Sequence, residues 1–276
     1  MSPTFKAACV QLNSGSDQQA NIDVALRLMR EAIASGAQLV MTPEYTALMD
    51  GSGRVMRAGA CDPDGEPALG AFRALAAETG AWLLIGSLTV RTAEERIANR
   101  SYLLAGDGTI VASYDKIHMF DVTLPDGRAI RESNAYRPGS TAVLASTPWG
   151  KLGMSVCYDL RFPGLYRTLA QAGADFLAVP SSFTAQTGPA HWHALLRARA
   201  IETTCFVFAP AMCGNHPGNR ATYGHSLIID PWGGILAELG EEPGIIVADI
   251  DCGEIAKARG MIPSLTHDRP FELPAG

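Results

Sequence analysis

Short apolar runs alternate with amphipathic segments almost from one end of the chain to the other. Apolar runs of a few residues are typical of buried strands, whereas apolar residues that recur every three or four positions are typical of helices. The predicted strands cover residues 5–11, 38–42, 81–90, 100–105, 109–114, 152–157, 175–180, 205–211, 226–230 and 245–250. The predicted helices cover residues 21–35, 68–79, 163–173 and 188–202.

The predicted strands and helices interleave without a linker, and this order favours a single α/β domain over residues 1–276, built from layers of sheet and helix. A glycine-containing turn at 106–108 joins two predicted strands as a hairpin, so we expect mixed sheets rather than purely parallel ones. The last stretch, residues 260–276, holds three prolines and little periodicity. We expect it to form an extended C-terminal tail that lies on a surface.

Composition narrows the class of protein. Of the 276 residues, 47% are hydrophobic and 18% are charged, which is typical of a globular chain. The net charge of −6 argues against a general nucleic-acid binder, because such proteins need a basic face. No apolar run approaches the roughly 20 residues that cross a membrane, and the N-terminus lacks the apolar region of a secretory leader. We therefore predict a cytoplasmic protein whose six scattered cysteines are free thiols.

Three reactive side chains each follow a predicted strand: Glu44, Lys116 and Cys157, with Cys157 ending the strand 152–157. Ligands of α/β sheets bind beyond the carboxyl ends of strands, so a carboxylate, an ammonium and a thiol could meet there in one pocket. Each residue also has a purely structural interpretation. The glutamate could cap a helix, the lysine could be solvated, and the cysteine could be a small core residue.

A set of local segments occurs in a distinctive order along nearly the whole chain. They are Thr42-Pro43-Glu44-Tyr45, Tyr114-Asp115-Lys116-Ile117-His118, Ser155-Val156-Cys157-Tyr158-Asp159-Leu160-Arg161-Phe162-Pro163, Gly188-Pro189-Ala190-His191-Trp192, Arg197-Ala198-Arg199-Ala200-Ile201-Glu202, Tyr223-Gly224-His225-Ser226 and Asp230-Pro231-Trp232-Gly233. Together they resemble the nitrilase superfamily, the carbon–nitrogen hydrolases. Within it, the chain looks most like the branch of omega-amidases and deaminated glutathione amidases.

This resemblance implies a site, a fold and an assembly. The family's Glu–Lys–Cys triad maps onto Glu44, Lys116 and Cys157, and a further family glutamate maps onto Glu132. The implied fold is an α/β four-layer α-β-β-α sandwich with mixed sheets. The resemblance also implies a homodimer or a higher homo-oligomer, and a mechanism that needs no cofactor and no metal.

The residue types suit hydrolysis of an amide through a cysteine thioester. A free thiol is mostly protonated at neutral pH; a nearby ammonium favours the thiolate, and a carboxylate opposes it but can take the proton directly. We hypothesise that Glu44 accepts the proton of Cys157, and that Lys116 and the backbone N–H of Tyr158 hold the oxyanion. Glu132 would orient Lys116 or the substrate. Its alternative role is that of a solvated loop carboxylate.

The preferred substrates of the resembled branch are anionic amides, so a guanidinium near the nucleophile is informative. Arg161 could receive a substrate carboxylate, or it could form a salt bridge with Asp159 or a neighbouring acid. Phe183 and Thr187 are predicted to wall the pocket, while His225 either lies near the pocket or is a buried structural residue. Where many members carry Asn or Met, this chain has Tyr45, which borders the pocket and bears on the choice of substrate.

Competing interpretations remain at this point. Ser155 and Ser226 stand in imitations of the G-x-S-x-G motif that lack the closing glycine, so a serine hydrolase is one alternative. A nitrile or N-carbamoyl substrate and a catalytically inactive binding scaffold are others. A metal enzyme is disfavoured, because His191 and His193 are two residues apart on a predicted helix and point to different faces.

Overall fold

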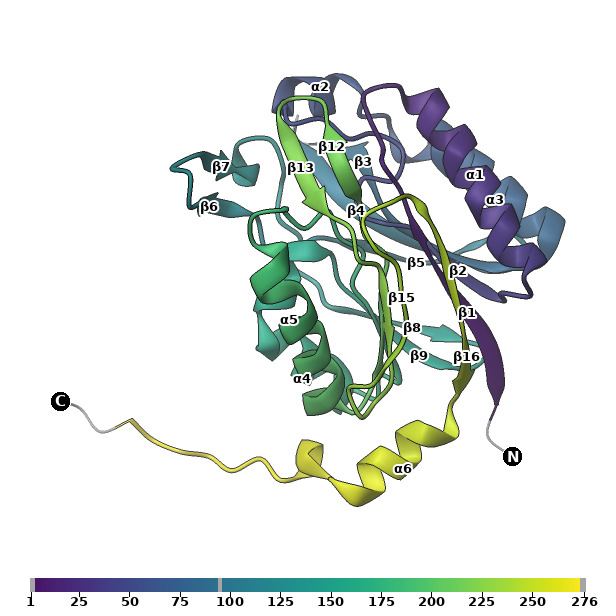
Figure 1. Ribbon diagram of the computed structural model, residues 1–276, viewed down its shortest axis with the longest axis vertical. Helices are drawn as coiled ribbons and strands as arrows, with labels where there is room; N and C mark the ends of the chain where they lie inside the picture. Colours follow the sequence, from purple (N-terminus) through teal and green to yellow (C-terminus); the bar gives the residue numbers. More distant parts are fainter. Residues whose placement is uncertain (1–2, 94–95, 274–276) are drawn as a thin grey trace.

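The computed structural model describes residues 3–93 and 96–273, which form two six-stranded sheets with helices on their outer faces (Figure 1). In spatial order, the first sheet contains β16 (Gly244–Asp251), β1 (Thr4–Gln11), β2 (Leu39–Met41), β3 (Trp82–Arg91), β4 (Ile97–Leu104) and β5 (Ile110–Asp115). The second sheet contains β15 (Ile235–Glu238), β14 (Leu227–Ile229), β11 (Phe206–Ala209), β10 (Phe176–Ala178), β9 (Gly150–Met154) and β8 (Val143–Thr147). Both sheets are mixed, as predicted: β1, β2 and β3 pair in parallel, as do β9, β10 and β11, and the outer strands are antiparallel.

The smaller elements complete the chain. Two short hairpins join β6 (Asp121–Thr123) to β7 (Ala129–Arg131) and β12 (Cys213–His216) to β13 (Arg220–Tyr223). The α-helices are α1 (Gln18–Ala34), α2 (Gly53–Ala58), α3 (Pro67–Thr79), α4 (Pro163–Gln171), α5 (Gly188–Thr203) and α6 (Gly253–Met261). Short 3₁₀ turns lie at Pro63–Gly65, Glu132–Asn134, Cys157–Arg161 and Ser264–Thr266.

The apolar residues of the central strands divide between two cores, because successive side chains of a strand point to opposite faces. In β1, Ala7 and Cys9 belong to the core between the sheets, whereas Ala8 and Val10 pack toward α1 and α3. The strand is buried on both faces, and this explains why its sequence is an almost continuous apolar run.

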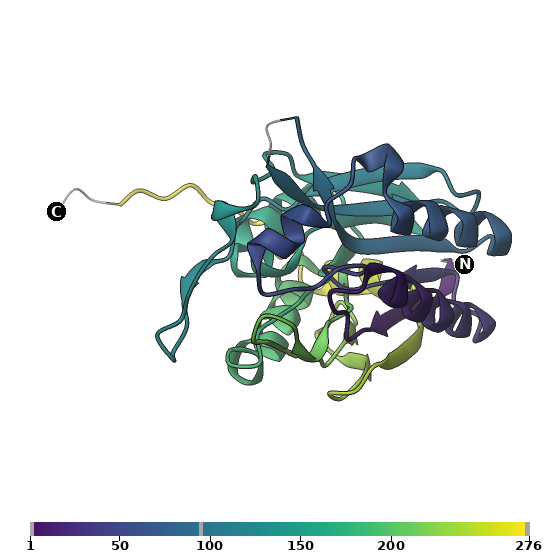
Figure 2. The same cartoon turned by 90° about the horizontal axis from the view of Figure 1, so that it is seen from above.

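The helices close the two outer faces. Leu28 of α1 and Phe72 of α3 join the core outside the first sheet, while Tyr166 of α4 and Trp192 of α5 join the core that includes the second sheet. Helix, sheet, sheet and helix therefore stack as four layers, and the predicted α-β-β-α sandwich is confirmed (Figures 1 and 2).

The strand predicted for 152–157 is wrong at its end. The strand β9 stops at Met154, and Cys157 begins the 3₁₀ turn Cys157–Arg161 with φ at 50°. A residue with a side chain is uncommon in this left-handed region, so the turn leaves the pleat of the sheet. The backbone N–H of Cys157 donates to Pro180 O at 2.9 Å, a bond that holds the turn against the neighbouring loop.

The C-terminal segment contains more structure than predicted. Helix α6 extends to Met261 and the turn Ser264–Thr266 follows, so the predicted tail 260–276 begins inside a helix. Arg167 of α4 pairs with Asp268, and residues 267–273 then run outward without helix or strand (Figure 2). Residues 274–276 lie outside the described part of the chain.

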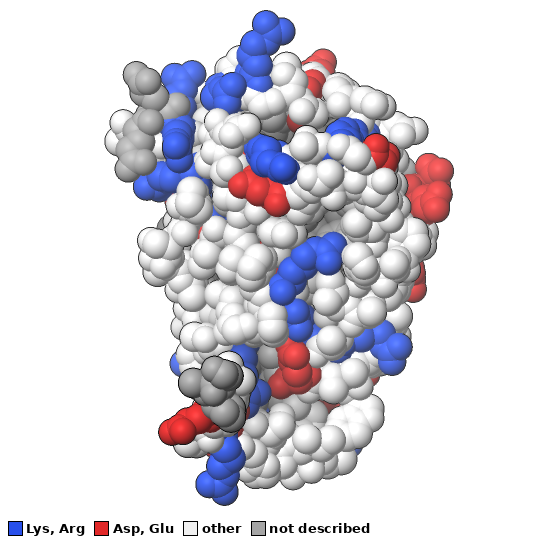
Figure 3. Space-filling view, turned by 90° about the vertical axis from the view of Figure 1, so that its left-hand side faces the viewer, with Lys and Arg blue, Asp and Glu red and all other residues white. Residues whose placement is uncertain are grey.

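Charged side chains of both signs lie on the face shown in Figure 3. Lys and Arg cover more of this face than Asp and Glu do, although the chain as a whole has a net charge of −6. None of the helices in residues 3–93 and 96–273 combines the length and the apolar composition needed to cross a membrane.

Candidate active site

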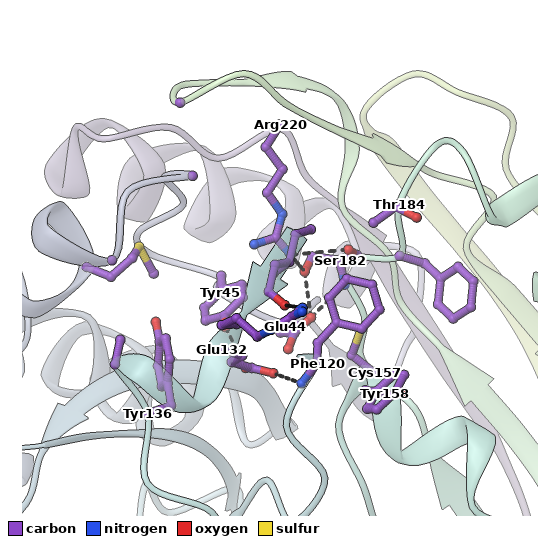
Figure 4. A pocket seen from close by; sticks show the side chains of 18 of the residues that line it. Glu44, Tyr45, Phe120, Glu132, Tyr136, Cys157, Tyr158, Ser182, Thr184 and Arg220 are labelled. Carbon is purple, nitrogen blue, oxygen red and sulfur yellow. Dashed lines mark hydrogen bonds between the residues drawn. The ribbon is translucent and has the colours of Figure 1, made fainter. Parts of the chain in front are cut away.

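A cavity of about 260 Å³ opens beyond the carboxyl ends of the strands, where both sheets deliver polar residues (Figure 4). All four predicted catalytic residues line it: Glu44, Lys116, Glu132 and Cys157. Five of the six predicted substrate-binding residues line it as well: Tyr45, Tyr158, Arg161, Phe183 and Thr187. The sixth, His225, lies elsewhere.

Glu44 reaches the cavity because β2 ends at Met41 and the chain turns sharply after Thr42. The turn packs against Gly86 of β3, where an added Cβ would lie 2.1 Å from Thr42 O. Only glycine allows this approach of two backbones. The glycine therefore sets the position of a charged side chain that is completely buried.

Lys116 follows β5 and forms a clamp with two carboxylates. Its Nζ donates to Glu44 Oε1 at 2.9 Å and to the two carboxylate oxygens of Glu132 at 3.0 and 2.9 Å. The ammonium is 2% exposed, so the interpretation of Lys116 as a solvated residue is wrong. All three donors of the ammonium face carboxylate oxygens, which is the arrangement that makes a buried charge tolerable.

The charges of this clamp control its protonation. Burial alone would raise the pKa of Glu44, but the positive charges of Lys116 and Arg220 and the hydrogen bonds from Ser182 and Lys116 lower it to about 2. Burial would lower the pKa of Lys116, yet the charges of Glu132 and Glu44 raise it well above its ordinary value. Glu44 is therefore an anion and Lys116 a cation at neutral pH.

The 3₁₀ turn Cys157–Arg161 is held by a buried carboxylate. Asp159 accepts hydrogen bonds from Val156 N at 2.8 Å, Tyr114 Oη at 2.7 Å and the backbone N–H of His118 at 3.0 Å. These contacts join the turn to the end of β5, the strand that delivers Lys116. The thiol and the ammonium thus share one rigid support.

The thiol of Cys157 is neutral in this state. Burial and the negative charge of Glu44 raise its pKa, and the opposing effect of Lys116 is smaller. The expectation that the ammonium favours a resting thiolate is therefore outweighed. A thiol beside an ionised carboxylate can still lose its proton to that carboxylate during attack.

Glu132 is fixed from three directions besides Lys116. Its carboxylate accepts from Tyr45 Oη at 3.0 Å and from the backbone N–H of Phe120 at 2.6 Å. The side chain of Asn99, in β4, donates to Glu44 Oε1 at 2.8 Å and to Glu132 Oε1 at 3.4 Å. Asn99 was missed from the sequence, because a single Asn within a strand carries no motif. Glu132 is not a solvated loop carboxylate.

The outer wall of the cavity is aromatic and basic. Arg161 lies over the rings of Phe183 and Tyr158, 5.3 and 5.9 Å from their centroids, and its Nη2 approaches His191 Nδ1 at 3.2 Å. The alternative salt bridge between Arg161 and Asp159 is wrong, since Asp159 instead meets His118 Nδ1 at 2.7 Å. The Arg161 guanidinium thus lies at the cavity and is not paired with Asp159, the carboxylate in the same turn.

His225 is not part of the cavity, and this corrects the sequence prediction. Its Nδ1 lies 2.9 Å from Glu238 Oε1, and His193 Nε2 lies 2.9 Å from the same oxygen. The three donor atoms lie within 4.8 Å of one another, close enough to share a cation. The pairing of His193 with His225 joins α5 to the end of the second sheet, and no spacing rule applied to His191 and His193 could have found it.

Two further residues at the cavity were not singled out from the sequence. Ser182 donates to Glu44 Oε2 from its backbone N–H at 2.9 Å and from its hydroxyl at 2.6 Å. Arg220 donates to the same hydroxyl at 2.7 Å. Ser182 and Arg220 lie outside the segments that carry the family resemblance. Only the fold brings them to the Glu44 carboxylate.

Comparison with known proteins agrees with this geometry. The family model described as carbon–nitrogen hydrolase matches residues 6–260. The chain belongs to the carbon–nitrogen hydrolase family. A human protein named deaminated glutathione amidase is 42% identical to this carbon–nitrogen hydrolase over 269 residues, which are 95% of this chain and 82% of the human one.

Solved structures extend the comparison to the fold. Saccharomyces cerevisiae Nit3, described as a member of branch 10 of the nitrilase superfamily, superposes with a TM-score of 0.87 at 32% identity and covers 97% of both chains. A variant of an amidase from Nesterenkonia sp. AN1 has a TM-score of 0.78 at 28% identity over 92% of both chains. That structure is described as showing the acetamide moiety of fluoroacetamide added covalently at the active-site cysteine.

Proposed function

We propose that this carbon–nitrogen hydrolase is an amidase that converts a small anionic amide to a carboxylate and ammonia through a thioester on Cys157. The observation that carries the proposal is the Lys116 clamp, in which one ammonium lies 2.9 Å from both Glu44 and Glu132 in the cavity that Cys157 lines. The named relatives support the reaction class, since they include amidases at 42% and 28% identity.

Acylation begins when Glu44 takes the proton of the Cys157 thiol and the sulfur attacks the amide carbon. A carbon–sulfur bond forms, and the carbonyl π electrons move to oxygen. The proton that Glu44 has taken weakens its hydrogen bond with Lys116, so that donor of Lys116 turns to this oxyanion, and the backbone N–H of Tyr158 donates to the oxyanion as well. Glu44 then gives its proton to the amide nitrogen, the carbon–nitrogen bond breaks, and ammonia leaves a thioester behind.

Deacylation repeats these transfers with water as the nucleophile. Glu44 takes a proton from the water, the oxygen attacks the thioester carbon, and the same donors hold the second oxyanion. The carbon–sulfur bond then breaks, and the sulfur recovers its proton from Glu44. Glu132 keeps Lys116 in position through both steps. A buried Lys–Glu pair suits this task because the ammonium stays charged without titrating.

The substrate class follows from the wall of the cavity and from the relatives. We propose that Arg161 receives a substrate carboxylate as a paired hydrogen bond, while Phe183 and Thr187 bound the apolar part of the substrate. Tyr45 acts through its hydroxyl, which donates to Glu132. A ω-amide of a dicarboxylic acid, or a larger deaminated glutathione-like peptide amide, has the required charge. The name of the human relative favours the second.

The positions of Ser155 and Ser226 argue against a serine hydrolase. Ser155 is buried and its hydroxyl contacts Ala178 O and Tyr166 Oη at 2.7 and 2.8 Å. Ser226 is also buried, and its hydroxyl lies 2.9 Å from Gln11 Oε1 and accepts from Ala211 N at 2.9 Å. Neither serine lines the cavity. A fluorophosphonate should therefore leave both unlabelled.

Ammonia release from a panel of amides tests the proposal. The panel contains ω-amides of short dicarboxylic acids, deaminated glutathione, neutral amides of matched size, a nitrile and an N-carbamoyl amino acid. We expect turnover of the anionic amides and a mass shift on Cys157 when the reaction is quenched in acid. No ammonia from any amide would favour the inactive scaffold, and preferred release from the nitrile or carbamoyl compound would favour another branch.

The same panel tests the carboxylate role of Arg161. The Arg161→Ala variant should lose kcat/KM selectively on anionic amides, because the loss of a bidentate pair affects only substrates that carry the carboxylate. Equal loss on neutral amides would contradict this role. The cytoplasm and a homodimer or higher homo-oligomer remain predictions, which cell fractionation and light scattering of the purified protein test.

A further inference from the structure

Arg220 connects a surface hairpin to the interior of the site. It is the first residue of β13, and its side chain points from the β12–β13 hairpin toward Ser182 and Glu44 (Figure 4). The Nη2 of Arg220 donates to Ser182 Oγ at 2.7 Å, and Ser182 Oγ donates to Glu44 Oε2 at 2.6 Å. The guanidinium therefore lies one hydroxyl group away from the proposed base.

The direction of this relay is fixed by chemistry. An arginine can only donate hydrogen bonds, so Ser182 Oγ must accept from Arg220. A hydroxyl has a single proton, and that proton is then free to point at Glu44 Oε2. Without the guanidinium the hydroxyl could rotate away. Arg220 thus favours the orientation in which the Ser182 hydroxyl donates its proton to Glu44.

The same guanidinium supports the second carboxylate of the clamp. Its central carbon lies 5.6 Å from the centroid of the Tyr45 ring, within the range of a cation–π contact. Tyr45, with φ at 62°, donates its hydroxyl to Glu132 Oε1 at 3.0 Å. Arg220 therefore contacts both Ser182, which donates to Glu44, and Tyr45, which donates to Glu132.

The hairpin that carries Arg220 is tied to its surroundings. His216 pairs with Arg220 across the hairpin, and its buried ring lies 2.8 Å from Ser14 O and 2.7 Å from Thr222 Oγ1. Tyr223 N donates to Phe183 O at 2.9 Å, which joins β13 to the loop that contains Ser182. The position of the guanidinium is thus set by the backbone on both sides.

We propose that Arg220 is a positioning residue for the amidase reaction: acting through Ser182 Oγ, it holds the Glu44 carboxylate in place and in its anionic form beside Cys157. This inference rests on the proposed function, and it assigns a role to a residue outside the Glu–Lys–Cys triad and Glu132. Of the arginines that line the cavity, Arg161 would then serve the substrate and Arg220 the base.

The electrostatics of the site agree with this role. The charged or titratable groups that act on Glu44 are Lys116, Cys157 and Arg220, with Glu132 across the ammonium, and the hydroxyls of Tyr45 and Tyr136 also lie close enough to feel its charge. After burial, which raises the pKa of Glu44, and Lys116, which lowers it, Arg220 is the next largest influence and lowers it further. Loss of the guanidinium should therefore raise the pKa of Glu44.

The pH profile of kcat/KM tests the proposal, because its acid limb reports the free enzyme's base. In Arg220→Gln, we expect the acid limb to move up by about one pH unit, since removal of a nearby opposite charge raises a carboxyl pKa. At neutral pH we expect kcat to fall about tenfold, a loss of the size seen when groups that orient metal ligands are removed, because Glu44 is then held less firmly. Arg220→Lys keeps the charge, so its limb should stay near that of the wild type while kcat falls.

Two further variants separate the relay from general damage. Ser182→Ala removes the hydroxyl and leaves the guanidinium, so it should lower kcat with a smaller shift of the limb. Arg128 lines the same cavity, but its guanidinium donates to Asn219 O at 2.5 Å and not to the clamp. Arg128→Gln should leave the limb at its wild-type position, whatever its effect on KM. Circular dichroism and the thermal midpoint establish that each variant is folded.

A measurement without substrate separates failure of this inference from failure of the proposed function. The rate at which iodoacetamide alkylates Cys157 also depends on an ionised Glu44, so its acid limb should move upward in Arg220→Gln as well. If the wild type turns over no amide, the proposed function fails, and the alkylation profile still tests Arg220. The positioning role would be overturned if the acid limbs of Arg220→Gln matched those of the wild type in both assays. It would also be overturned if the folded Arg220→Gln protein showed a raised KM and no other change.

Discussion

Two buried cysteines show how differently two regions of this molecule use the same side chain. Cys9 lies in β1 between the sheets, and its thiol lies 3.8 Å from the carbonyl oxygen of Leu227. Cys157 lies at the cavity beside Glu44 and Lys116. Burial raises the pKa of both thiols. Burial alone therefore does not distinguish the proposed nucleophile Cys157 from the core residue Cys9. An acceptor for the proton and an opening for the substrate do.

The two regions also differ in how they are stabilised. Between the sheets, apolar side chains such as Phe176 and Phe208 pack with ring centroids 5.8 Å apart, and their stability comes from burial. At the ends of the strands, two carboxylates and an ammonium are buried together. Such a cluster tolerates the loss of a partner poorly, because the remaining charge stays buried without compensation.

The largest expected effect separates the two thiols. Cys157→Ala should lower amide turnover by at least about 10⁴-fold, since no other group supplies the nucleophile, and should leave the thermal midpoint nearly unchanged. Cys9→Ala should show the reverse, with turnover retained and a loss of about 1–2 kcal/mol in the free energy of unfolding. Ammonia assays and denaturant titrations measure both. Retained turnover in Cys157→Ala would favour the alternative that Cys157 is only a small core residue.

The next effect concerns the ionic cluster. Lys116→Ala should lower kcat by about 10²–10³-fold through loss of an oxyanion donor. It should also cost about 3–5 kcal/mol in the free energy of unfolding, because two buried carboxylates lose their common partner. Lys151→Ala, at an exposed position, should change stability by less than about 0.5 kcal/mol. Equal stability of the two variants would contradict the clamp.

A backbone contact comes third. An added methyl at Gly86 meets Thr42 O at 2.1 Å, so Gly86→Ala should displace the turn that carries Glu44 and cost about 1–3 kcal/mol. Gly70 of α3 has open space at the same position, so Gly70→Ala should be neutral or stabilise by up to about 1 kcal/mol. Thermal unfolding with kcat/KM distinguishes them. A Gly86→Ala protein of normal activity would mean that the turn is adaptable.

The smallest effect is on the pH dependence of stability. The pKa of Glu44 is lowered from 4.5 to about 2, so the folded protein resists the proton that the unfolded chain takes up. The stability contributed by Glu44 is present above pH 4.5 and is lost as the pH falls toward 2. The difference in unfolding free energy between wild type and Glu44→Gln should narrow across this window. A constant difference in urea titrations would contradict the shift.

Sequence reasoning succeeded where a residue belongs to a long pattern. The apolar run of β1 predicts a strand because both faces of that strand are buried. Helix α5 was predicted from Pro189, which occupies its first turn. It failed at short elements such as the β6–β7 and β12–β13 hairpins, which have three or four residues per strand and no clear alternation. Cys157 was placed on a strand because a turn with positive φ leaves no mark on an apolar sequence.

The resemblance of local segments along nearly the whole chain to one family, among them the segments of Glu44, Lys116 and Cys157, predicted the reaction class. Only the tertiary structure decided that Lys116 joins Glu44 to Glu132, that Arg220 reaches Glu44 through Ser182, and that His225 belongs to another cluster. The physical reason is the difference between distance along the chain and distance in space. Local composition determines strand, turn and residue type, whereas hydrogen bonds and charges act over a few ångströms between groups that are distant in the chain. Their partners are therefore chosen only when the two sheets pack.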